Sequence, residues 1–246
     1  MSDLRIDYSD LHGIVEEGAR RSEEREERRA RVRGLPRRFL RKLALYGGAF
    51  LGLAVLPFFL LIRGGVTAYR AWGLGTWPAL VLAVAATGAL LALYAVVVGR
   101  RMGAGPRMRR VLSRAAVGVA AAYAVYGLVF IASENVKTES IRAEYASVHP
   151  LLRVAASALV LVDAEAVITD AGRTPEDYWL MGLPRAEASL HFEQETGFVH
   201  ALDLRTNGRS EVRNRAVELG FWALGFHSLR HVGTADHLHL SLRLPE

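Results

Sequence analysis

Histidine is concentrated in the last part of the sequence, where several copies stand near carboxylates. Seven of the eight histidines follow residue 134, namely His149, His191, His200, His227, His231, His237 and His239. A lone histidine is usually a satisfied polar residue, but several on strands beside aspartates are candidates for binding a metal ion. The chain has no cysteine, so any zinc ion must be held by imidazole and carboxylate groups.

Four short motifs with polar side chains follow one another in this region. They occupy residues 167–175, 189–191, 197–203 and 236–239, with the sequences VITDAGRTP, SLH, GFVHALD and DHLH. No single motif is specific for one chemistry, but the four in this order are more specific than any one of them.

This series resembles the zinc D-Ala-D-Ala peptidase family over roughly residues 165–242. In that family a strand leads to an arginine, a Ser-x-His-x-x-Gly-x-Ala-x-Asp motif follows, and a carboxylate stands three residues before a final histidine. The resemblance implies the hedgehog-like metallopeptidase fold, a zinc cofactor and hydrolysis of peptides that contain D-amino acids.

Carried over residue by residue, the resemblance makes His191, Asp203 and His239 the zinc ligands, which leaves a fourth position for water. Asp236 would match the catalytic carboxylate that passes a proton from this water to the leaving amine. Arg173 would match the arginine that steadies a substrate carboxylate or the developing oxyanion. Ser189 would support the site or contact the substrate, and a simple ion pair is the alternative role for Arg173.

The middle ligand has an alternative, because the spacing from His191 to Asp203 is five residues longer than in the family. A hairpin turn centred near Gly197 would set His191 opposite Asp203. A turn centred nearer Glu195 would set His191 opposite His200 instead. His200 is therefore the alternative ligand.

The last motif raises a second hypothesis about function. Asp236 stands where the family usually has a glutamate, so its carboxylate reaches one methylene less far. The chain would then be a catalytically inactive, peptidase-like binding or scaffolding protein of the cell envelope.

Because side chains alternate along a strand, His237 shares a face with His239 and can contact the substrate or its oxyanion.

The elements that must position these residues form an α+β domain with a small antiparallel sheet at residues 134–246. We expect helices at 137–162, interrupted near His149, from Thr174 onward, and at 213–224, ended by Gly225. We expect strands at 164–169, 189–193, 198–204 and 237–243, with a turn at 194–197. His227 and His231 are expected to be structural.

Three stretches before this domain carry no charge and are long enough to cross a bilayer. About 20 helical residues span a hydrocarbon core of about 30 Å. We therefore predict a three-helix transmembrane bundle at 43–133, with helices near 43–63, 78–98 and 115–133, after a charged segment at 1–42. The predicted helices contain almost no ionisable residue, which favours an anchor over an ion pathway.

The distribution of lysine and arginine predicts the orientation. Basic residues cluster within 31–42 and 100–114, whereas the loop between the first two helices holds only Arg63 and Arg70. The positive-inside rule then places the N-terminus in the cytoplasm of a bacterial-type cell and residues after 134 outside the cytoplasmic membrane. This is the compartment of peptidoglycan peptides, the substrates that the resemblance implies.

The net charge of +6 is explained by these membrane flanks, and no basic patch interleaved with aromatic residues suggests nucleic acid. The N-terminal segment is dense in Glu and Arg, and Glu24 with Arg28 and Glu27 with Arg31 have the i,i+4 spacing of helical ion pairs. We expect a solvated helix there, with a membrane or cytoplasmic partner as the alternative.

Overall fold

The computed structural model describes residues 17–25, 37–180, 182, 188–233 and 236–245. The chain divides into two compact units, Met1–Ala54 and Val55–Glu246, and the boundary falls within helix α2 (Arg37–Arg70). In the first unit, residues 17–25 are helical, and an i,i+4 ion pair joins Arg21 to Glu17. The two ion pairs predicted in this segment involve residues 26–36, which lie outside the described residues.

Three helices are long and apolar enough to cross a membrane, in agreement with the sequence. They are α2, α3 (Thr76–Arg101) and α4 (Pro106–Val129). In the most apolar stretch of each helix, only 11–17% of the residues are buried. Such an exposed apolar surface is typical of helices that cross a membrane. Compared with the prediction, α2 and α3 continue into their charged flanks, and α4 begins earlier and ends at Val129.

Helix α6 (Pro150–Val162) joins the apolar helices to the C-terminal domain. It packs against α4, and the apolar residues of α6 share one buried core with α2, α3 and the sheet. A glycine in α4, Gly127, permits this approach, because a Cβ atom there would lie 3.2 Å from Cα of Val154. Arg153 of α6 donates a hydrogen bond of 2.7 Å from Nη1 to the carbonyl oxygen of Leu128, at the C-terminal end of α4. This places a cation where the helix dipole is negative.

His149 fixes the start of α6 to the start of α3. It is fully buried, and its Nδ1 accepts a hydrogen bond from the backbone N–H of Leu151. The proton of the neutral ring is therefore on Nε2, which donates to Oγ1 of Thr76 at 3.0 Å. Burial, followed by the charges of His200 and Arg153, lowers the pKa of His149 to about 3. The expected interruption near His149 is confirmed, since Pro150 is the first residue of α6.

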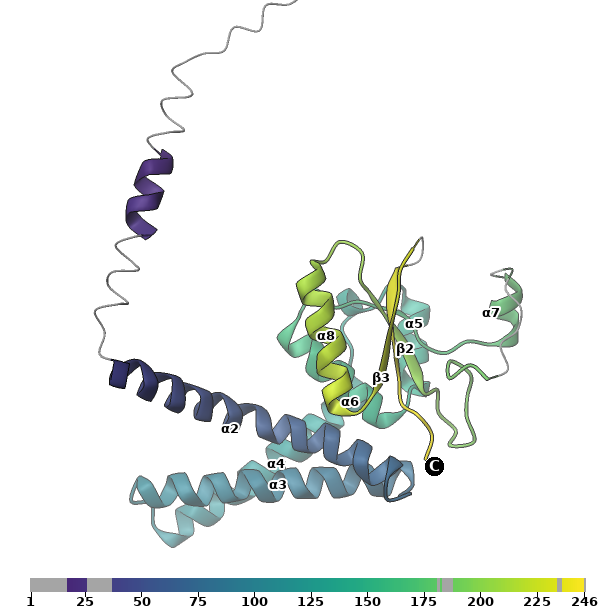
Figure 1. Cartoon of the computed structure of the whole chain (residues 1–246). Helices are drawn as coiled ribbons and strands as arrows, with labels where there is room; N and C mark the ends of the chain where they lie inside the picture. Colours follow the sequence, from purple (N-terminus) through teal and green to yellow (C-terminus); the bar gives the residue numbers. More distant parts are fainter. Residues whose placement is uncertain (1–16, 26–36, 181, 183–187, 234–235, 246) are drawn as a thin grey trace, which may run out of the picture. The chain divides into compact units, whose positions relative to one another are not determined.

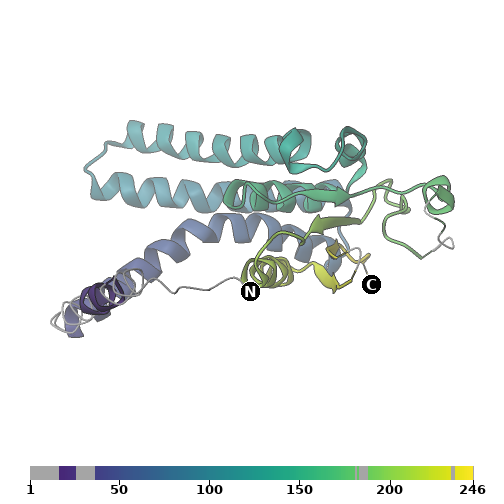
Figure 2. The same cartoon turned by 90° about the horizontal axis from the view of Figure 1, so that it is seen from above.

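The C-terminal domain contains the small antiparallel sheet that the sequence predicts. Its four strands have the spatial order β1-β2-β4-β3 and are all antiparallel. They are β1 (Ile168–Asp170), β2 (Ala201–Arg205), β3 (His227–His231) and β4 (His237–Ser241). The helices around the sheet are α5 (Glu139–Glu144), α7 (Pro175–Leu180) and α8 (Glu211–Leu224), and α8 contacts β3 and β4. Figures 1 and 2 show these elements beside the ends of the apolar helices of the same unit.

Two strand predictions differ from the structure. Residues 189–193 form turns and a single bridge between Glu193 and Val199, so the strand predicted there is wrong. Strand β3 was not predicted, because the sequence HSLRH has only one apolar residue in five. The predicted turn at 194–197 is confirmed by a hydrogen bond of 2.9 Å from Gly197 N to Gln194 O. Helix α8 ends at Gly225, as expected, with a φ of 97° that favours glycine.

The two faces of the sheet have different chemistry. On one face, the leucines of β2 and β4 are buried in the core at Leu202, Leu204, Leu238 and Leu240. The alternate residues Asp203, His237 and His239 point to the other face. Burial of the leucines therefore fixes which side chains are presented on the polar face.

We predict that Gly127→Val destabilises the protein by about 1–3 kcal/mol, because the added side chain would meet the backbone of Val154, which cannot give way as a side-chain tip can. The measurement is the midpoint of thermal unfolding of the full chain in detergent. Gly118→Val on the same helix is the matched control, since a Cβ atom there has nothing within 4 Å. Equal midpoints for the two variants would contradict the close packing of α6 on α4.

The buried neutral His149 predicts a loss of stability in acid. Its folded pKa of about 3 lies below the ordinary value of 6.5, so its contribution is complete above pH 6.5 and is lost as the pH falls toward 3. The slope is at most about 1.4 kcal/mol for each pH unit. His149→Asn keeps an acceptor for Leu151 but does not titrate, so its unfolding curve should depend less on pH. Some dependence should remain, because burial also lowers the pKa of His200. Parallel pH profiles for the two proteins would argue against a neutral buried His149.

Candidate metal centre

Three of the predicted site residues converge on the polar face of the sheet. Nδ1 of His239 lies 2.9 Å from Oδ1 of Asp203. Nε2 of His191 lies 3.2 Å from Nδ1 of His239 and 3.4 Å from Oδ1 of Asp203. All three atoms are within 4.8 Å of one another, and the group can hold a metal ion.

The spacing of these atoms fits a small tetrahedral ion. Two ligand atoms, each about 2.0–2.1 Å from zinc at a tetrahedral angle, are about 3.3 Å apart. The three observed separations of 2.9, 3.2 and 3.4 Å lie around this value. Two imidazoles and one carboxylate also form a donor set that zinc accepts, and they leave a fourth position for another ligand.

Strand pairing brings two of the three residues together. Asp203 of β2 and His239 of β4 are directly opposite each other in the antiparallel register. His191 comes from the irregular segment that replaces the predicted strand. Backbone hydrogen bonds of 2.9 Å fix this segment, one from Arg173 N to His191 O and one from His200 N to Leu190 O. Ser189 also supports it, since its Oγ accepts a hydrogen bond from the backbone N–H of His191 at 3.3 Å.

A hydrogen bond behind His191 orients its ring for metal binding. Nδ1 of His191 lies 2.6 Å from the carbonyl oxygen of Ala171. A carbonyl can only accept, so the proton is on Nδ1, and the lone pair of Nε2 faces the other two side chains. Histidine ligands of metal ions commonly have such a carbonyl partner, which fixes both tautomer and ring orientation.

Asp203 is the electrostatic centre of the group. Burial would raise the pKa of Asp203, but contacts with the imidazoles of His191 and His239 hold this pKa well below its ordinary value. Nη2 of Arg173 lies 3.2 Å from Oδ2 of Asp203. Nε of the same arginine donates to Oδ2 of Asp170 at 2.6 Å. Arg173 therefore contacts the metal-binding group through Asp203. It also forms an ion pair with Asp170, which was the alternative role predicted for it from the sequence.

Two further histidines lie next to the group. Nε2 of His237 is 3.6 Å from Oδ2 of Asp203. The ring of His231 stacks on the ring of His237, with 4.6 Å between centroids, and lies edge-on to His239. His231 was predicted to be structural, but its pairing with β4 brings it to the polar face. A prediction of strand β3, with its side-chain alternation, would have placed His231 beside His237.

Comparisons with known proteins identify no relative. No family model, curated protein or solved structure matches this chain. What the site can do is therefore derived from its own side chains.

Two of the predicted site residues lie elsewhere. Asp236 directly precedes β4, and Arg230 of β3 donates to both its carboxylate oxygens, at 2.7 Å and 2.9 Å. Oγ1 of Thr206 donates to the same carboxylate at 2.5 Å. Asp236 is thus held away from the His191, Asp203 and His239 group, contrary to expectation. The cause is strand alternation, which turns residues 236 and 239 to opposite faces.

His200, the alternative ligand, is also on the leucine face. Its ring is fully buried, and its centroid lies 4.7 Å from that of His149. Nε2 lies 2.7 Å from Oγ1 of Thr196, and Nδ1 lies 3.0 Å from the carbonyl oxygen of Leu242. Both ring nitrogens therefore have partners in the core, and His200 is not part of the candidate metal centre.

A cleft of about 760 Å³ lies on the Arg173 side of the metal centre. Its wall includes Phe192, next to His191 in the chain, and the carboxylates of Glu144, Asp177 and Glu193. Burial, followed by the charges of Asp170 and Asp177, raises the pKa of Glu144. One arginine and three acidic residues thus line the same cleft.

We predict that the full chain in detergent binds a single zinc ion and that a chelator lowers its unfolding midpoint. At a zinc concentration of 100 times Kd the ion would stabilise the fold by about 2.7 kcal/mol. Asp203→Asn with His239→Ala should abolish binding, whereas His227→Ala, in the same sheet but outside the group, should retain it. Elemental analysis after dialysis measures this. Full zinc content in the double variant would place the metal elsewhere.

Proposed function

We propose that this chain is a membrane-anchored, zinc-dependent peptidase that hydrolyses peptides of the cell wall. The observation that carries the proposal is the convergence of His191, Asp203 and His239, which come from one loop and two strands. The same three residues are the ligands that the resemblance to the D-Ala-D-Ala peptidases implies. The side-chain spacing supports this assignment independently of the sequence motifs.

Zinc with three protein ligands supplies a Lewis acid and a bound water whose pKa is about 7. Around it, the residues of the chain have separate tasks. His239 donates its Nδ1 proton to Asp203, and this nitrogen would bind the metal ion after losing the proton. Ala171 keeps the proton of His191 on the ring nitrogen that faces away from the centre.

His237 is the residue placed to move a proton during hydrolysis. Its Nε2 approaches Asp203 on the polar face, and its side chain is 26% exposed, so substrate can reach it. An imidazole at this position can take up a proton at Nε2 and deliver it to the leaving amine. Asp236, which the resemblance assigns to this task, is instead bound to Arg230.

The cleft beside Arg173 supports a peptide substrate with charged groups of both signs. Arg173 can offer its Nη1 to a substrate carboxylate, because its Nε and Nη2 already bond to Asp170 and Asp203. The carboxylates of Glu144, Asp177 and Glu193 can receive an ammonium group. Peptides of the cell wall that contain a diamino acid carry both groups.

The location of the reaction follows from the membrane helices together with the charge distribution. The helices are apolar enough to span a bilayer, and arginine is dense at the α3–α4 connection and sparse at the α2–α3 connection. By the positive-inside rule, this distribution supports a metal centre on the outer side of the cytoplasmic membrane, where peptidoglycan lies.

The ion pair of Asp236 with Arg230 favours a second candidate function, a binding or scaffolding protein without turnover. If proton transfer requires Asp236, the pair with Arg230 prevents it from reaching the metal centre. A protein that binds zinc and cell-wall peptide but releases no product would have this second function.

We predict that the zinc-loaded full chain releases products from muropeptides, detected by chromatography and mass spectrometry. His239→Ala should abolish release together with zinc binding. His237→Gln should keep its zinc and lose about 10²–10⁴-fold in kcat, because a proton carrier is removed.

Asp236→Asn is the matched variant, and it should retain most of the kcat if its carboxylate is only structural. A large loss in Asp236→Asn with none in His237→Gln would reverse the two roles. Zinc binding without any product from the native chain would leave the binding protein as the answer.

A further inference from the structure

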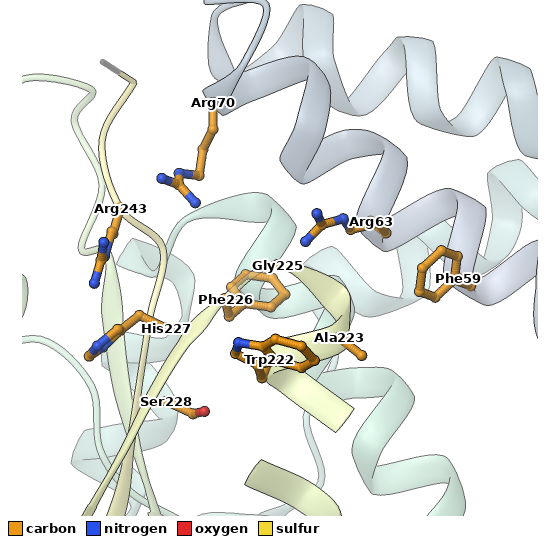
Figure 3. A pocket seen from close by; sticks show the side chains of 10 residues that line it. All are labelled: Phe59, Arg63, Arg70, Trp222, Ala223, Gly225, Phe226, His227, Ser228 and Arg243. Atoms are coloured by element: carbon orange, nitrogen blue, oxygen red, sulfur yellow. The ribbon is translucent and has the colours of Figure 1, made fainter. Parts of the chain in front are cut away.

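A second cleft, of about 640 Å³, lies between the end of α2 and the C-terminal domain, and the metal centre is not part of it. Figure 3 shows Phe59, Arg63 and Arg70 on the α2 side. The opposite side is formed by the end of α8, the start of β3 and the segment after β4, with Trp222, Phe226, His227 and Arg243 among its residues. All of these residues belong to the second compact unit.

The charge of this cleft is of one sign. Three arginines and one histidine line it, and its wall contains no aspartate or glutamate. Within the described part of the chain, no carboxylate lies within ion-pair distance of Arg63 or Arg243, both of which are exposed. Burial, followed by the charge of Arg243, lowers the pKa of His227. A concave surface of this kind attracts anions.

The position of the cleft along α2 places it at the boundary between hydrocarbon and water. Arg63 is the first charged residue after the uncharged stretch at 43–62, and Phe59 lies one turn back within that stretch. Arg70 lies seven residues beyond Arg63, or about 10 Å along the helix. The cleft therefore begins among apolar side chains and ends at the depth of lipid headgroups.

The other wall has the chemistry of a membrane interface. Trp222 is 69% exposed, and its indole suits the boundary region, where one part of the ring is apolar and the N–H is hydrated. Val212 and Leu219 are also exposed and lie on the same side of α8 at spacings of ten and three residues from Trp222. Arg215 lies between them on the same side of the helix, so this side combines exposed apolar residues with a cation, a mixture that suits an anionic membrane surface.

We propose that this cleft binds the phosphate of an anionic phospholipid headgroup, with the acyl chains beside Phe59. Arginine recognises phosphate through paired, charge-assisted hydrogen bonds. A zwitterionic headgroup offers the same phosphate, but its ammonium would find no carboxylate in the wall. The cleft thus selects lipids with a net negative charge.

The contact of Arg63 with the C-terminal domain supports a preformed binding site. A Cβ atom on Gly225 would lie 2.5 Å from Nη1 of Arg63, so this guanidinium lies directly against the end of α8. Arg63 also lies at the C-terminal end of α8, where a cation is stabilised by the helix dipole. Stabilisation of α8 alone would not require Arg243 on the facing wall.

The test uses the full chain in detergent with phosphatidylglycerol, phosphatidylcholine or inorganic phosphate as the added probe. Native mass spectrometry and the unfolding midpoint should both show binding of phosphatidylglycerol, at least about tenfold tighter than phosphatidylcholine. Arg63→Gln with Arg243→Gln should weaken phosphatidylglycerol binding at least about tenfold, since each factor of ten corresponds to about 1.4 kcal/mol. Arg142→Gln, on α5 and outside the cleft, is the matched control and should bind as the native chain does.

The unfolding midpoint without lipid reports on folding of the variants, and Arg243→Gln alone provides a milder change. Equal binding of the two lipids, or unchanged binding in the double variant with a native midpoint, would overturn the proposal. Displacement of the lipid by millimolar inorganic phosphate would assign the cleft to free phosphate instead. None of these outcomes depends on peptidase activity.

Discussion

The register between β2 and β4 is the constraint on which the candidate metal centre depends. It sets Asp203 opposite His239 on one face while four leucines of the same strands enter the core on the other. A shift by one residue would bury the aspartate and histidine and expose the leucines. The hydrophobic effect therefore determines, indirectly, which polar groups meet. His191 can join them because its loop is tied to the same sheet by backbone hydrogen bonds.

The two aspartates near these strands, Asp203 and Asp236, have different roles. Asp203 is a buried anion surrounded by imidazoles and by the guanidinium of Arg173. Its partners satisfy both oxygens, which offsets the cost of burying a charge. Asp236 is equally well satisfied, by Arg230 and Thr206, on the other side of the strand. Asp203 is therefore available to a metal ion, whereas Asp236 stabilises the edge of the sheet.

Much of this arrangement could be predicted from sequence, and the failures have physical causes. The length of the uncharged stretches identified the three apolar helices. Gly197 indicated a turn and Gly225 indicated the end of a helix. The segment around His191 was assigned to a strand because local alternation cannot reveal that tertiary hydrogen bonds hold an irregular loop. The place of Asp236 was open to prediction, since the alternation that grouped His237 with His239 also turns Asp236 away. Pairing of β3, which brings His231 to the site, depends on contacts distant in sequence.

The contact of α6 with α3 and α4 determines how the domain can move. His149 bonds to Thr76, Arg153 bonds to Leu128, and Gly127 lets the two helices touch, so the domain is not suspended on a flexible tether. An enzyme on a flexible tether can reach peptidoglycan over a range of distances from the membrane. A domain packed against its membrane helices stays at one distance. The peptidase that we propose would therefore act on cell-wall peptides close to the bilayer. It would not reach peptides farther from the membrane.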